Sequence, residues 1–306
     1  MEHMKGSLKI NKMTNREEIQ RKLTSVYYNK LMEEISKQKM PFISSVQETC
    51  DYVWGKDIRR CLAHVENGKM IEEDLSVELS SLYTSITIPK NLIDYDLFCQ
   101  ESARSVIKEL EQQYLRGFGI CENKPFYGLD YVFDNSKMFY GVERRELRKS
   151  KQIILPKSIF NCYAFMNTLY DIICILKNPC NDTCRHIDHI ICTYDMLYLF
   201  EKMFANMPNT FYNKNGRWIL DFNTEENISP ICVNFSAECK KNEILLLNSS
   251  TITLHRLCDW LWLSGEDGKI IRGEDTYNYY ATLVKYCNLI CTNPQYNAKI
   301  ILKEER

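Results

Sequence analysis

The spacing of the hydrophobic residues changes near residue 118, and this change limits the fold class. In the first third of the chain, apolar residues recur at the three- and four-residue intervals of an α-helix. Thr14 and Glu17 form a capping box in front of one such stripe, and Gly117 follows another as a stop signal. The pattern predicts helices over 14–35, 45–65, 71–83 and 95–116.

After residue 118 the apolar runs become short and are separated by turn residues. The stretch "LDYVFDNSKMFYGV" (129–142) alternates around Asp134, which predicts a β-hairpin. Short strands are predicted at 217–222, 230–235, 243–247 and 299–303. Helices are predicted at 158–178, 251–263 and 276–291. In the last of these, Cys287 and Cys291 lie on the apolar stripe and are predicted to pack in the core.

These patterns predict an α+β protein with a mainly helical region (1–118) followed by a mixed α+β domain (119–306) with short antiparallel strands and buried helices. The chain has 306 residues, 45% of them hydrophobic, which is enough for a substantial core. No apolar run reaches the length of a membrane span, and the N-terminus lacks the apolar segment of a signal peptide. We therefore expect a cytoplasmic or nuclear protein that is not secreted.

The composition excludes several function classes. Only 11 glycines occur, and the glycine-rich phosphate-binding motifs of ATPases and dinucleotide enzymes are absent. The formal net charge of −1 gives no global positive field, so contact with nucleic acid would need a local basic patch. Fourteen cysteines in a chain without a secretion signal favour reduced thiols, in the core or in metal sites. The abundance of Asn, Ile, Lys and Tyr is typical of AT-rich genomes, including those of some viruses.

The stretch "CNDTCRHIDHIIC" (180–192) carries the first candidate site. Cys180, Cys184, His189 and Cys192 have the spacing C-x3-C-x4-H-x2-C, and thiolates with imidazoles are the ligands of structural zinc. The stretch resembles the retroviral zinc knuckle, whose central gap it matches and whose outer gaps and glycine it lacks. This resemblance implies a zinc cofactor.

Two other interpretations of this stretch stay open. His189 and Cys192 also fit an ordinary half-buried strand or helix, because unbonded cysteine is often a core residue. A variant zinc site would pair Cys180 and Cys184 with His255 and Cys258.

The predicted hairpin carries the second candidate site. Counting from its turn places Asp130, Glu143 and Arg145 on one face. Two carboxylates and a cation can hold Mg²⁺ and a scissile phosphate. The stretch resembles the G-D-Y…E-R-K core of the XPF-type nucleases, with Arg145 in place of the lysine and Leu129 inserted before Asp130. The resemblance implies a metal-dependent nuclease.

The third candidate is a cysteine hydrolase. "NCYAFMNTLY" resembles the NlpC-type pattern, in which a cysteine at a helix N-terminus is the nucleophile. The resemblance implies Cys162 as nucleophile and His189 as base. A buried cysteine on a buried helix explains the same residues without catalysis.

The first reading of the whole sequence is a non-catalytic protein that binds protein or nucleic acid, of viral type and stabilised by zinc. The nuclease and the hydrolase are its alternatives, and the sequence does not indicate an oligomeric state. A basic segment supports the nucleic-acid contact; its members are Arg144, Arg145, Arg148, Lys149 and Lys151.

Neutralising Arg144, Arg145 and Arg148 together should weaken binding to RNA or DNA and reduce its dependence on salt, because fewer counterions are released. Fluorescence anisotropy at several salt concentrations measures both effects. Binding that does not vary with salt in the unmodified chain would contradict the role of this segment.

Overall fold

The computed structural model describes residues 15–37, 46–53, 56–66, 69–91, 94–117, 125–134, 138–140, 142–143, 149–157, 162–176, 187–222 and 229–304. The chain forms two compact units, each assembled from three segments. Unit 1 comprises Met1–Gln38, Thr84–Ile107 and Leu261–Leu283, and unit 2 comprises Lys39–Tyr83, Lys108–Trp260 and Val284–Arg306. Within the described residues, no helix is both long and apolar enough to cross a bilayer.

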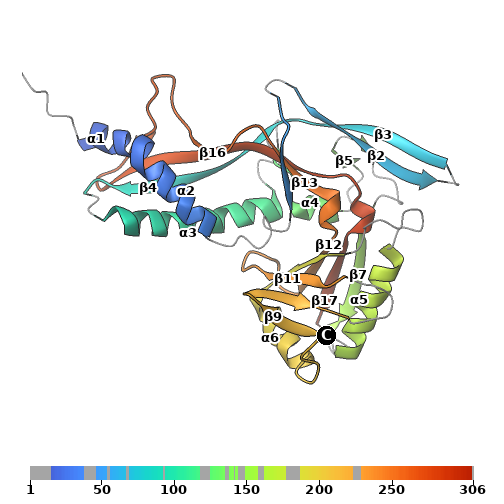
Figure 1. The fold of residues 1–306 in the computed structure, drawn as a ribbon. Helices are drawn as coiled ribbons and strands as arrows, with labels where there is room; N and C mark the ends of the chain where they lie inside the picture. The colour runs from blue at the N-terminus through green and yellow to red at the C-terminus, as the bar shows by residue number, and fades with distance from the viewer. Residues whose placement is uncertain are drawn as a thin grey trace, which may run out of the picture. The chain divides into compact units, whose positions relative to one another are not determined.

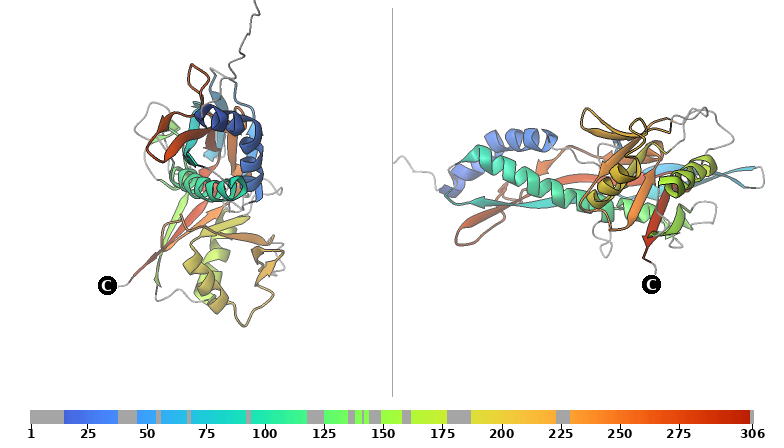
Figure 2. Two further views of the ribbon diagram at one scale, coloured as in Figure 1. Left: turned by 90° about the vertical axis from the view of Figure 1, so that its left-hand side faces the viewer. Right: turned by 90° about the horizontal axis from the view of Figure 1, so that it is seen from below.

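Unit 1 packs the N-terminal helices against the first half of a long helix. Its elements are α1 (Asn15–Lys22), a π-helical turn (Leu23–Tyr27), α2 (Tyr28–Lys37) and the start of α3 (Tyr95–Arg116). The N-terminal helices lie alongside α3 in every view (Figures 1 and 2). The buried ring of Tyr27 stacks on Tyr95 at 4.9 Å, and Lys30 pairs with Asp96 at 2.6 Å. The predicted helices at 14–35 and 95–116 are confirmed.

A long strand, β16 (Asn278–Cys291), contributes residues to both units and belongs to a six-stranded sheet. Its partners are β13 (Ile252–Arg256), β14 (Leu261–Trp262), β15 (Gly273–Glu274) and β4 (Ser80–Pro89), while β1 (Gln47–Cys50) adds in parallel to β13. The buried ammonium of Lys285 on β16 pairs with Glu48 of β1. This ion pair links two strands that are not hydrogen-bonded neighbours.

Several predicted helices are strands. The predicted helices at 45–65 and 71–83 are replaced by β1, by the hairpin β2 (Ile58–Glu66) and β3 (Lys69–Val77), and by the start of β4. The predicted helices at 251–263 and 276–291 are β13, β14 and β16. Residues four apart share a face in a helix and also in a strand, so these short apolar patterns fit both. Cys287 and Cys291 are fully buried on β16, so their predicted core position is confirmed.

Unit 2 contains a seven-stranded sheet with one face covered by helices. In spatial order its strands are β7 (Lys151–Pro156), β17 (Ala298–Lys303), β12 (Glu243–Leu247), β8 (His189–Cys192), β11 (Ile231–Phe235), β10 (Arg217–Leu220) and β9 (Phe211–Lys214). The helices α5 (Cys162–Leu176) and α6 (Tyr194–Met203) lie beside it (Figure 1). The predicted strands at 217–222, 230–235, 243–247 and 299–303 and the predicted helix at 158–178 are confirmed.

The core of this sheet follows the alternation of side chains along each strand. Ile190, Val233, Leu246 and Ile300 all point to the face that packs against Phe200 of α6 and its helical neighbours. Because one face is closed by helices, a shift of one residue in any of these strands would move its apolar side chains out of the core.

Replacing Leu246 with alanine should lower the free energy of unfolding by about 2–5 kcal/mol, because the cavity left in this core cannot collapse fully. Ile154 on β7 is 54% exposed, so Ile154→Ala is the matched control and should change stability little. Urea unfolding followed by circular dichroism measures both. Equal losses in the two variants would contradict the described faces of the sheet.

Candidate functional site

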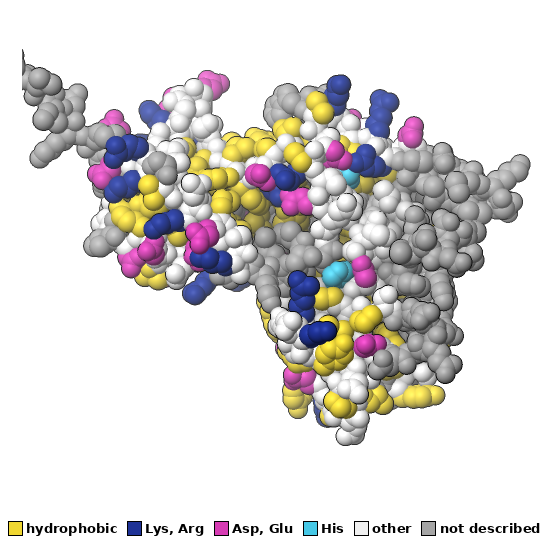
Figure 3. Space-filling view, in the orientation of Figure 1, with side chains coloured by type: hydrophobic (Ala, Val, Ile, Leu, Met, Phe, Trp, Pro, Cys, Tyr) yellow, Lys and Arg dark blue, Asp and Glu magenta, His cyan; other side chains and the backbone are white. Residues whose placement is uncertain are grey.

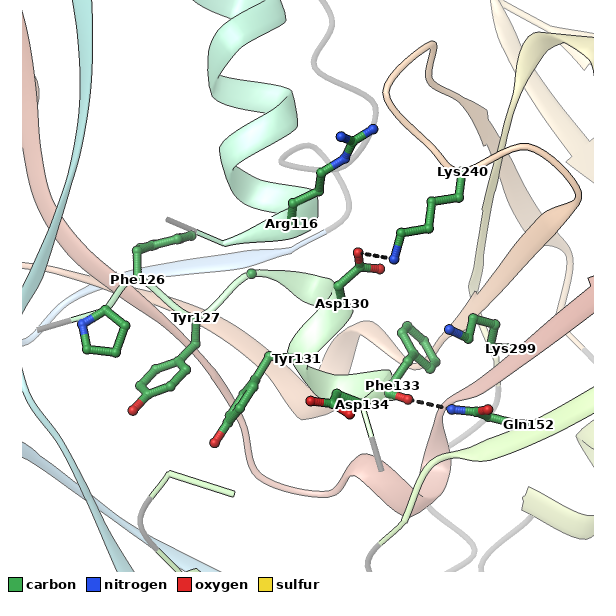
Figure 4. Close-up of a pocket in the computed structure, with 12 residues that line it drawn as sticks. Arg116, Phe126, Tyr127, Asp130, Tyr131, Phe133, Asp134, Gln152, Lys240 and Lys299 are labelled. Atoms are coloured by element: carbon green, nitrogen blue, oxygen red, sulfur yellow. Dashed lines mark hydrogen bonds and ion pairs between the residues drawn. The ribbon is translucent and has the colours of Figure 1, made fainter. Parts of the chain in front are cut away.

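A cavity of about 480 Å³ lies within unit 2. Its walls come from the end of α3, the short helix α4 (Leu129–Phe133), the turn before β12, and the strands β7 and β17. Figure 4 shows side chains from these elements around one space, with Asp130 between Arg116, Lys240 and Lys299. Its volume falls in the range of small-molecule sites, about 300–1,000 Å³.

Two glycines allow α4 to begin beside the end of α3. Gly117 ends α3 with φ of +79°, a backbone conformation that favours glycine. A Cβ on Gly128 would stand 2.0 Å from the backbone nitrogen of Gly117, so only glycine fits there. The buried side-chain oxygen of Asn288 accepts a hydrogen bond from the Tyr127 N–H at 3.0 Å, directly before Gly128. The close approach of the two glycines and this hydrogen bond position α4 so that Asp130 lines the cavity.

The helical period of α4 sorts its side chains. Leu129, Val132 and Phe133 are fully buried, whereas Asp130 and Tyr131 are partly exposed. The predicted hairpin over 129–142 is therefore wrong in its first half, which is helical; a smaller hairpin pairs β5 (Met138–Phe139) with β6 (Val142–Glu143). The five residues of α4, four of them apolar or aromatic, are too few for their pattern to distinguish a strand from one helical turn.

The carboxylate of Asp130 is held by a lysine distant in sequence. Lys240 donates to it at 2.6 Å. Burial lowers the pKa of Lys240, but the hydrogen bond to Asp130 and the negative charge of that carboxylate together raise it by more. The pKa of Lys240 is therefore above its ordinary value. Lys240 is therefore protonated near neutral pH, and its charge offsets that of the Asp130 carboxylate in the cavity.

Lys299 of β17 supplies a second cation. Its side chain is only 11% exposed, and its ammonium lies 3.7 Å from Glu243, which is too far for a hydrogen bond. Next to it on β7, Gln152 donates from Nε2 to the Phe133 carbonyl at 2.6 Å. Arg116, at the end of α3, is exposed and completes the cationic lining.

Aromatic rings form the opposite wall. The rings of Tyr127 and Tyr131 lie 4.5 Å apart, and Tyr131 stacks on Phe139 at 5.4 Å. Figure 4 shows both tyrosine rings side by side, on the side of Asp130 away from Lys299. Burial raises the pKa of Tyr127, so this phenol stays neutral. The cavity thus has a cationic side, which can bind an anionic group, and an aromatic side, which can pack against a ring.

The predicted nuclease residues are not brought together on one strand face. Asp130 lies on α4 in its ion pair with Lys240, and Glu143 is on β6 opposite Met138. Arg145 lies outside the described residues. In the part of the chain that the structure describes, no cluster of three or more His, Cys, Asp or Glu side chains could hold a metal ion.

The predicted zinc ligands are divided by the sheet. Cys180 and Cys184 lie outside the described residues. Cys192 points into the helix-covered core, whereas His189, three residues earlier on β8, points to the opposite face. One metal ion therefore cannot take both while β8 is intact. The variant site also differs, because His255 on β13 contacts the Asp51 carboxylate at 2.8 Å.

His189 has different neighbours from those predicted. Cys232 is its register partner on β11, and the Asn234 amide lies 3.2 Å from His189 Nδ1. Burial raises the pKa of Cys232, so this thiol is protonated near neutral pH. Cys162 is the first residue of α5, as the hydrolase pattern predicts, and its side chain lies outside the described part.

The basic segment is only partly described. Arg144, Arg145 and Arg148 lie outside the described residues, while Lys149 and Lys151 are partly buried. On the face drawn in Figure 3, Lys and Arg side chains are dispersed among Asp and Glu. That face carries no single described basic patch.

Acidification should destabilise the protein through His189. Burial is the main cause of its lowered pKa, so the unfolded chain, with an ordinary value of 6.5, takes up the proton first. Stability is therefore lost as pH falls from about 7 to 5. His189→Asn should make unfolding free energy less dependent on pH in urea titrations. An unchanged pH dependence would contradict the burial of the imidazole.

No protein-family model matches the sequence, and neither does any curated protein. Similarity appears at the level of structure. The virus-like particle protein from Pyrococcus furiosus aligns with a TM-score of 0.52 and 10% identity, over 89% of this chain and 96% of that one. The SrpI encapsulin from Synechococcus elongatus gives 0.51 and 13%, over 88% and 91%.

A viral capsid protein gives the same result. The capsid protein of cyanophage A-1(L) aligns with a TM-score of 0.54 and 11% identity, covering 87% of this chain and 93% of its own. The α+β class predicted from the sequence is confirmed, and the similarity extends over nearly the whole of each chain. The chain has the HK97-like capsid fold.

Proposed function

We propose that this chain is a structural subunit that assembles with copies of itself into a closed shell, as a viral capsid or an encapsulin-type compartment. The observation that carries the proposal is the coverage of both chains: the alignments span 87–89% of this chain and 91–96% of the similar chains. Those three proteins are described as a virus-like particle, an encapsulin complex and a capsid.

The surface of the isolated chain supports the same proposal. Tyr194 and Tyr198 lie one turn apart on α6 and are 59% and 68% exposed. Exposed aromatic side chains are enriched at protein–protein contacts. Tyr163, on α5 in the same unit, is also exposed. A second copy of the chain would cover such residues.

The proposed subunit has a structural and non-catalytic role. The described lining of the cavity beside α4 consists of charged, amide, aromatic, proline and glycine residues, and burial raises the pKa of Cys232. In this proposal the segment 144–151 contacts nucleic acid that the shell encloses. Zinc ligation by Cys180 and Cys184 would stabilise the subunit and requires partners other than the pair His189 and Cys192.

Purified full-length chain should sediment as species far larger than its 36.2 kDa monomer, and negative-stain images should show closed particles of uniform size. Tyr198→Ser should shift the sedimentation profile toward small species, because an exposed anchor is lost. Glu201→Gln, on the same helix and also exposed, is the matched control. A monomer at every concentration, or irregular aggregates alone, would contradict the proposal.

A further inference from the structure

We propose that the cavity beside α4 binds a small anion that carries a flat ring, such as a nucleoside monophosphate or an aromatic carboxylate. This inference concerns a ligand site and does not depend on shell formation. Its basis is the combination of a cationic side and an aromatic side around one space within unit 2.

The charge of the lining favours an anion. Three cationic side chains and two carboxylates surround the cavity, namely Arg116, Lys240, Lys299, Asp130 and Asp134. Asp130 and Lys240 neutralise each other at 2.6 Å. Arg116 and Lys299 remain on the cationic side, where Glu243 lies 3.7 Å from Lys299 and compensates part of its charge. Asp134 is exposed on the tyrosine side of the cavity (Figure 4). The anionic group of a ligand would lie on the other side, near Lys299.

Lys299 is the cation of the lining best placed to bind the anionic group of a ligand. About nine-tenths of its side chain is buried, and its ammonium makes no hydrogen bond to any described residue. Glu243, at 3.7 Å, provides charge compensation without accepting a hydrogen bond. The side chain of Lys299 lines the cavity, so a phosphate or carboxylate bound there could accept a charge-assisted hydrogen bond from its ammonium.

The aromatic side favours a ring over a bare anion. Tyr127 and Tyr131 line the cavity with their rings 4.5 Å apart, and Tyr131 stacks on the buried ring of Phe139 at 5.4 Å. Stacking of a base on such side chains contributes about 1–3 kcal/mol. Gln152 uses Nε2 for the Phe133 carbonyl, which leaves its side-chain oxygen to accept a hydrogen bond from a ligand. A cavity of about 480 Å³ accommodates both groups together.

Isothermal titration calorimetry of the full-length protein tests the inference with four probes. These are adenosine monophosphate, 4-hydroxybenzoate, adenosine and inorganic phosphate. At least one of the first two should bind, and the comparison between them identifies phosphate or carboxylate as the anionic group. Adenosine and inorganic phosphate should each bind at least about tenfold more weakly, because each lacks one half of the recognition.

Three variants assign the binding to the cavity. Lys299→Met should weaken the binding by about tenfold or more, and Lys299→Arg should retain most of it because the charge is kept. Lys303→Met is the matched control, since Lys303 lies on the same strand and is exposed. Circular dichroism verifies that all three variants fold.

Several results would overturn the inference. One is the absence of binding by both ring-bearing anions. Another is inorganic phosphate or adenosine binding as tightly as adenosine monophosphate. A third is an equal effect of Lys299→Met and Lys303→Met.

Discussion

The strand β8 is the element on which unit 2 depends, because it forms hydrogen bonds along both edges. Its flanking residue Asp188 donates its N–H to the Leu247 carbonyl at 3.0 Å and accepts the Cys232 N–H at 2.9 Å. At its other end, the Cys192 carbonyl accepts the Ser236 N–H at 2.9 Å. Both faces of β8 are buried at Ile190 and Ile191. Its register is therefore fixed from both sides and both faces.

That register determines what the candidate residues can do. In this register the side chain of Cys192 lies in the helix-covered core, and His189 lies on the opposite face beside Cys232. The same sheet, further along, carries Lys299 on β17 and Gln152 on β7 to the cavity beside α4. The scaffold of a shell-type fold thus also positions a cavity whose lining is charged and aromatic.

Much of the local structure could be predicted from the sequence. The helix at 95–116 was predictable because a long apolar stripe ends at Gly117, and the strands at 231–235 and 243–247 because short apolar runs lie between polar turns. The strand β16 was missed because its burial pattern is nearly continuous over 14 residues, which also fits a buried helix. Tertiary pairing with β13 decides between the two.

The site was less predictable than the fold. Asp130 was singled out, but its partner Lys240 lies 110 positions away, and no local pattern indicates the pair. Lys299 reads as an ordinary surface lysine at a polar position of an alternating strand. Cys232 and Asn234 lie two apart on one strand, and only the parallel pairing with β8 brings them to His189. Contacts between distant segments supply information that a single sequence does not contain.

We propose that this chain, which has the HK97-like fold, assembles with copies of itself as a shell subunit. Electron cryo-microscopy of particles formed by the purified full-length chain tests it most directly. We expect a closed shell built from copies of one chain. The density of each subunit should resolve α3, β16 and the seven-stranded sheet, with β8 between β11 and β12. Discrete monomers, or a subunit map in which β8 does not separate β11 from β12, would contradict it.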